Sequence, residues 1–112
     1  MEYTRLMSIL DDFFDQQQPM ILYWDGGCVI KGINGTGAFE SSNMLELDDE
    51  NYQEYYACGI EIKEIVASNN SPKCLEIQET LKNGYMVEIT PFNEPLKVET
   101  VDGQVLWSRT EK

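Results

Sequence analysis

The apolar residues of this chain change their spacing at Pro19, and this change constrains the fold more than any other feature. Before Pro19 they recur at the helical spacing, with polar side chains on the opposite face. They are Leu6, Met7, Ile9, Leu10, Phe13 and Phe14. After Pro19, short apolar stretches alternate with clusters of Gly, Asn, Asp and Pro, which is typical of strands and turns. The spacing predicts an amphipathic helix within residues 1–16, followed by strands.

Residues 20–66 predict a series of antiparallel strands. Two strands are expected at 20–24 and 28–33, because Asp25-Gly26-Gly27 between them can adopt the positive φ angles of a tight hairpin. Glycines punctuate the end of the second strand and predict a bend or bulge there. They are Gly32, Gly35 and Gly37. Their spacing does not match the dinucleotide-binding pattern, and no Lys-Ser or Lys-Thr pair follows, so nucleotide binding is not expected.

The next segment predicts short strands at 38–40 and 44–47 around the polar turn Ser41-Ser42-Asn43. Residues 48–54 have the composition of a loop. A long strand follows at 55–66, where apolar residues alternate with one break in register.

The last third predicts a helix and a meander. Ser71 as N-cap and Pro72 at the first helical position favour a helix over 72–83, closed by Asn83-Gly84 as a left-handed cap. The alternative is a strand over 75–81 with Asn83-Gly84 as a hairpin turn. Three strands are then expected at 85–90, 96–101 and 104–108. Prolines at 91 and 95 bracket the first connection, and Asp102-Gly103 forms the second.

Residues 22–65 resemble the small barrels of the Sm-like and SH3-like kind. The resemblance rests on Asp25-Gly26, Lys31-Gly32-Ile33, Asn43-Met44-Leu45-Glu46-Leu47 and Cys58-Gly59-Ile60. It implies a small barrel. Together with the predicted helices, this leads us to expect an α+β fold in which the N-terminal helix packs on a bent, barrel-like antiparallel sheet. The whole chain of 112 residues has the size of a single domain.

The strongest compositional feature is acidity. Twenty acids face eight bases and no histidine, which gives a net charge of -12. Residues 1–56 carry eleven acids and two bases, whereas residues 57–112 carry nine acids and six bases. A negative field repels phosphate backbones and anionic membranes, so neither nucleic acid nor a membrane is expected as a partner. The field would attract a basic protein, and the alternative is that it serves solubility alone.

Nothing in the sequence indicates catalysis, a cofactor or a metal site. Without histidine, the chain has no Ser-His or Cys-His nucleophile pair and no imidazole ligand. Cys28, Cys58 and Cys74 form no C-x-x-C pair and lie in or beside apolar stretches, so buried free thiols are expected. The acids at 48–50 lack the ligand spacing of a calcium loop. No secretion signal and no apolar run of membrane-spanning length is apparent, so we expect a cytoplasmic protein.

The densest acidic stretch ends beside tyrosines, and we predict a partner-binding surface there. Carboxylates would steer a basic partner, and aromatic rings would hold it. The predicted residues are Glu40, Glu46, Asp48, Asp49, Glu50, Tyr52, Glu54 and Tyr55. Trp24 and Trp107 are expected in the core, and strand alternation should turn either Tyr55 or Tyr56 inward.

In size, charge and absence of catalytic residues, the chain is also similar to small acidic bacterial immunity proteins. This resemblance implies a non-enzymatic protein that neutralises a basic partner such as a toxin nuclease. Two alternatives are an Sm-like oligomeric regulatory module that binds RNA or a small ligand, and a small enzyme that uses carboxylates only.

Overall fold

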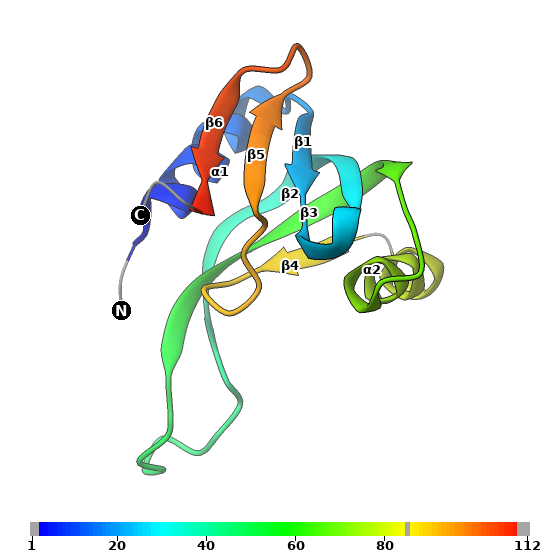
Figure 1. Ribbon diagram of the computed structural model, residues 1–112. Coiled ribbons are helices and arrows are strands. Elements are labelled where there is room, and N and C mark those ends of the chain that lie inside the picture. The colour runs from blue at the N-terminus through cyan, green and yellow to red at the C-terminus, as the bar shows by residue number, and fades with distance from the viewer. Residues whose placement is uncertain (1–2, 85, 110–112) are drawn as a thin grey trace.

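The computed structural model describes residues 3–84 and 86–109, which form two helices and one antiparallel sheet (Figure 1). The helices are α1 (Arg5–Gln16) and α2 (Pro72–Asn83), and a short 3-10 turn, η1, covers Asp25–Gly27. The strands are β1 (Met20–Tyr23), β2 (Val29–Ser42), β3 (Glu54–Ala67), β4 (Met86–Ile89), β5 (Lys97–Thr100) and β6 (Val105–Ser108). The α+β class is therefore confirmed.

The sheet is open, and the predicted barrel-like closure is wrong. Its strand order is β4-β3-β2-β1-β5-β6, with antiparallel neighbours throughout. Closure would require the edge strands β4 and β6 to pair, and in the described part of the chain they lie at opposite edges. The register shifts of the long β2–β3 hairpin, including one at Gly32, bend it as the glycines predicted.

One face of the sheet forms the core together with both helices. Buried side chains alternate along the strands and meet across the ladder, for example Leu22 opposite Ile30 and Val98. The helices add Leu6, Met7, Leu10, Cys74 and Ile77 to the same cluster. Trp24 and Trp107 are buried, as are the three cysteines, so these core predictions are confirmed.

The first helix and the first hairpin follow the sequence closely. Thr4 caps α1 by accepting a hydrogen bond from the Met7 amide at 3.2 Å, and Gln17 ends it in the left-handed region with φ 53°. Gly26 and Gly27 in η1 have φ of 81° and 86°, as the predicted hairpin required. The helix within 1–16 and this turn are confirmed over the described residues.

The middle of the chain corrects two predictions. Residues 38–40 are not a separate strand, because β2 runs unbroken to Ser42. Gly37, with φ 71°, and a register shift between Asn34 and Ala38 absorb the irregularity, and pairing with β3 then continues. Residues 44–47 are not a strand either, since they lie in the loop that joins β2 to β3. The long strand predicted at 55–66 is confirmed as β3.

The second helix is confirmed, and the strand alternative for 75–81 is wrong. The Ser71 hydroxyl accepts a hydrogen bond from the Cys74 amide at 3.4 Å, and Pro72 opens α2. The predicted left-handed cap is wrong, because Gly84 is extended with φ −171°.

The C-terminal strands exist but do not form a meander. The hairpin between β5 and β6 is confirmed. The expected hairpin between β4 and β5 is wrong, because β4 pairs with β3 at one edge while β5 pairs with β1. The predicted first residue of the meander, Tyr85, lies outside the described residues.

Candidate partner-binding surface

The distal part of the β2–β3 hairpin projects from the rest of the molecule (Figure 1). We call this part, residues 38–58, the arm. It consists of a two-stranded ribbon and the connecting loop at 43–53. The molecule measures 44 × 30 × 26 Å along its principal axes. A projecting ribbon can reach into a concave surface of another protein.

Asn43 holds the loop of the arm in shape. Its backbone amide donates to the Gln53 carbonyl at 3.1 Å, and its side-chain amide donates to the Asn51 carbonyl at 2.8 Å. Its side-chain oxygen accepts from the Gln53 amide at 3.2 Å. Asp49 also accepts from the Asn51 amide at 2.8 Å. Asn and Asp side chains commonly replace backbone partners in this way, so the loop is closed on itself rather than extended.

The structure places all eight predicted residues on the arm, where the six acids are exposed and the two tyrosines are half-buried. Tyr55 is already engaged within the molecule, since its ring meets Phe92 edge-on at 5.4 Å and its hydroxyl donates to the Ser42 carbonyl at 3.0 Å. Tyr56 packs against the core and meets the Tyr3 ring, which confirms that one of this pair turns inward. The role of the eight residues in binding remains a prediction.

Sequence reasoning missed the exposed apolar residues at the tip. Met44 is 88% exposed and Leu47 is 81% exposed, although both were expected in a strand. Phe92, in the β4–β5 connection beside Tyr55, is also exposed. Their exposure could have been predicted from their place in the sequence, because Met44 and Leu47 lie between a polar turn and the acids at 48–50. Exposed apolar side chains beside charged ones are a common feature of protein interfaces.

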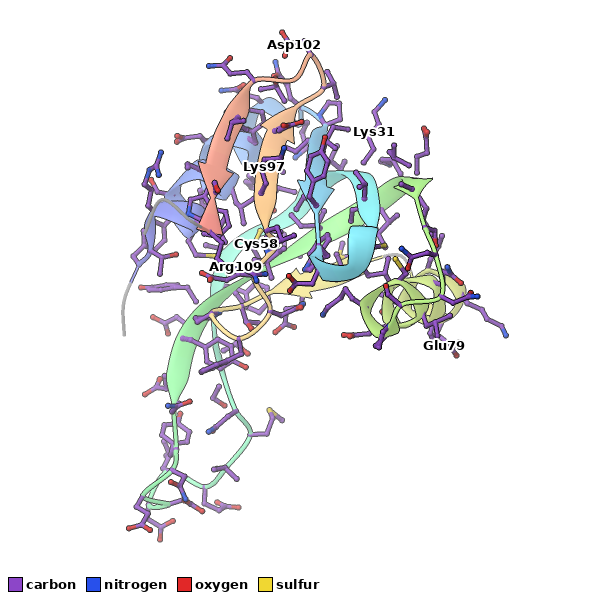
Figure 2. All side chains as sticks on the ribbon, viewed as in Figure 1. Lys31, Cys58, Glu79, Lys97, Asp102 and Arg109 are labelled. Atoms are coloured by element: carbon purple, nitrogen blue, oxygen red, sulfur yellow. The ribbon has the colours of Figure 1, made fainter. Side chains whose placement is uncertain are left out.

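Within residues 3–84 and 86–109, no ion pair joins a base to an acid of the arm. The described ion pairs join Lys63 to Glu61, Lys73 to Glu76, Lys97 to Glu99 and Arg109 to Asp25, and none involves the arm. Figure 2 shows Lys31, Lys97 and Arg109 on the body of the molecule, away from the distal loop of the arm. The arm itself contains six acids and no base. It is therefore a concentrated source of negative potential.

A second polar cluster, on the sheet face away from the helices, has its charges satisfied. Lys97 lies 2.9 Å from Glu99, and the Tyr23 hydroxyl donates to Glu99 at 2.8 Å. The lysine ammonium also lies 4.3 Å from the centre of the Tyr23 ring. Hydrogen bonds from Lys97 and Tyr23 lower the pKa of Glu99, and the bond to Glu99 raises the pKa of Tyr23. This cluster offers a partner less unpaired charge than the arm does.

No group of three or more His, Cys, Asp or Glu side chains between residues 3 and 109, residue 85 excepted, is placed to hold a metal ion. Within the same part of the chain, neither helix has the length and apolar character needed to cross a membrane.

The structure is an α+β fold from which an acidic arm projects (Figure 1). Residues 1–111 match the model of the family described as cognate immunity protein YxxD. The chain belongs to this family, and the resemblance to immunity proteins is confirmed. Membership implies binding to a cognate toxin, and immunity proteins are typically non-enzymatic. No curated protein and no solved structure matches the chain, and the Sm-like resemblance of residues 22–65 is not confirmed.

Proposed function

We propose that this immunity protein neutralises a basic toxin by binding it through the arm. The family supplies the cognate toxin as partner. We infer that this toxin is basic because the arm has six exposed carboxylates and no base among them. Charges of this kind accelerate encounter with an oppositely charged surface and reject surfaces of the same sign.

A nuclease is the class of toxin that fits this arrangement best. An enzyme that acts on nucleic acid needs a positive surface to contact the phosphate backbone. The carboxylates of the arm would occupy that surface and exclude the substrate. The three cysteines are free and buried, which suits a cytoplasmic protein, because thiols stay reduced there.

The partner can be identified by capture on the immobilised protein from a lysate of the native host, at low and at high salt. We expect one basic protein, retained at low salt and weakened at high salt because salt screens the attraction. The captured protein must also arrest growth when it is expressed alone and lose this toxicity when the immunity protein is co-expressed. A captured toxin with an acidic binding surface would contradict the proposal.

Charge reversal tests the arm directly. The variant Asp48→Lys/Asp49→Lys/Glu50→Lys should slow association with the captured toxin by about tenfold or more at low salt, with a smaller effect at high salt. The matched control is Glu64→Lys/Glu79→Lys/Asp102→Lys, which makes the same change of net charge at exposed residues outside the arm. Figure 2 shows Glu79 on α2 and Asp102 at the β5–β6 turn. Equal slowing by both variants would show that net charge acts, and not the arm.

A further inference from the structure

One flank of the arm carries an open hollow of about 380 Å³. Carboxylates, hydroxyls, a thioether and an aromatic ring line it. The lining residues are Glu40, Ser41, Ser42, Met44, Tyr52 and Glu54. This combination offers negative charge, hydrogen-bond acceptors and an apolar surface within one site.

The strand register places the two carboxylates as neighbours. Glu40 pairs with Tyr56, and Ser42 pairs with Glu54, so Glu40 and Glu54 are diagonal to each other on one face of the ribbon. Diagonal side chains in an antiparallel pair are separated by about 7 Å. Like charges at this separation repel, and in the described part of the chain no base lies between them. A cation in the hollow would relieve this repulsion.

We propose that the hollow receives an arginine side chain of the cognate toxin. This inference depends on the proposed function, in which the toxin is basic. The planar guanidinium group can bind carboxylates on two sides and stack on the Tyr52 ring, while its aliphatic stem contacts Met44. A lysine ammonium is more strongly hydrated and lacks the flat face, so arginine is the better occupant.

The hollow is formed before the partner arrives. The Met44 amide donates to the Ser42 hydroxyl at 3.2 Å, and the Tyr52 amide donates to the Asp49 carbonyl at 3.0 Å. Met44 has φ 68°, a left-handed conformation that the surrounding loop maintains. Binding at a preformed site loses less conformational entropy, which favours a specific anchor over diffuse attraction.

A small-molecule titration tests the site without the toxin. Backbone amide shifts would be followed by NMR at low salt, as N-acetyl-arginine N-methylamide or its neutral citrulline analogue is added. We expect shifts at Glu40, Tyr52 and Glu54 with the arginine compound, at millimolar concentrations, and several-fold smaller shifts with citrulline. The variant Glu40→Gln/Glu54→Gln should lose these shifts. The control Glu64→Gln/Glu79→Gln should retain them, and amide spectra of both variants verify folding.

The inference is overturned if the citrulline compound causes equal amide shifts, or if the amides of the arm do not shift. It is also overturned if the arginine compound causes equal amide shifts at all the acidic surfaces of the protein. Any of these results would leave the charge-reversal test of the arm intact, so the two proposals fail separately. Once the toxin has been captured, Glu40→Gln/Glu54→Gln should also raise its dissociation rate by about 30-fold. An unchanged dissociation rate would show that the hollow does not hold a toxin residue.

Discussion

The two halves of the β2–β3 hairpin differ sharply, although the same two strands build both. One half, residues 29–34 and 59–67, lies inside the six-stranded sheet, where β2 also pairs with β1 and β3 also pairs with β4. Ile30, Ile60 and Ile62 are buried there. In the arm, most of the ribbon has no further strand beside it, and its acids are exposed. Packing stabilises the first half, while the second half is free to concentrate charge.

A group of hydrogen bonds made by polar side chains lies between the two halves. The buried side chain of Asn34 donates to the Leu10 carbonyl at 2.8 Å and accepts from the Gly37 amide at 2.8 Å. Asp11 of α1 accepts from the Ala38 amide at 2.7 Å. The first helix therefore holds the arm where it leaves the sheet. Anchoring at this end allows the distal acids to be placed without a compensating core.

The comparison predicts its largest effect for apolar truncations. Leu22→Ala, at a fully buried position of the central strand β1, should lower the free energy of unfolding by about 2–5 kcal/mol. The matched change Leu47→Ala, at the exposed tip, should alter it by less than about 0.5 kcal/mol. Urea unfolding followed by circular dichroism measures both. Similar losses in the two variants would show that the arm contributes to the packed core.

A smaller effect on the free energy of unfolding, dependent on pH, is expected from Cys58, where β3 enters the core. Burial and the nearby Asp11 carboxylate raise the pKa of this thiol from 9.0 to about 12. Below pH 9 the thiol is protonated in both the folded and the unfolded chain, so its contribution to stability is complete. At higher pH only the unfolded chain loses the proton, and stability falls as the pH rises toward 12.

Urea unfolding between about pH 9 and 11 should show this loss, up to about 1.4 kcal/mol per pH unit from this thiol. The loss should be smaller in Cys58→Ala than in the wild type but not absent, because burial also raises the pKa of the Cys28 thiol to about 12. Cys74→Ala is the control. Burial raises the pKa of Cys74, but hydrogen bonds involving Ser71 and Cys28 outweigh it and lower the pKa overall. This control should therefore keep the loss. Parallel pH profiles for the wild type and Cys58→Ala would contradict the expected burial of the thiol.

The smallest effect on the free energy of unfolding is expected from the backbone conformation at the tip of the arm. Met44→Gly should raise the free energy of unfolding by about 0.5 kcal/mol, because glycine adopts the left-handed conformation without the steric cost of a side chain. Leu47→Gly is the control and should lower it slightly, since glycine gains entropy in the unfolded chain. Both are measured by urea unfolding. A loss of stability in Met44→Gly would show that the Met44 side chain contributes to the arm.

Local patterns were sufficient for the helices and for two of the turns. The apolar spacing before Pro19 predicted α1, and Ser71 with Pro72 predicted α2, because caps and periodicity act within a few residues. The turns at Asp25–Gly27 and Asp102-Gly103 were predicted for the same reason. The exposure of the six acids of the arm also followed from the sequence, since carboxylates with no base nearby in the chain favour solvent.

Only the tertiary structure decided how the strands are arranged and where the apolar tip lies. The pairing of β4 with β3 and of β5 with β1 joins residues distant in the chain, and no local pattern encodes that choice. Closure, expected from a resemblance in the first half, failed because the C-terminal strands were added at opposite edges. The exposure of Met44 and the hollow beside Tyr52 also depend on how the loop folds back on Asn43. The sequence by itself determined the elements and the sign of the charge, because these depend on neighbouring residues. Tertiary structure decided which surfaces meet, because that depends on the packing of the whole chain.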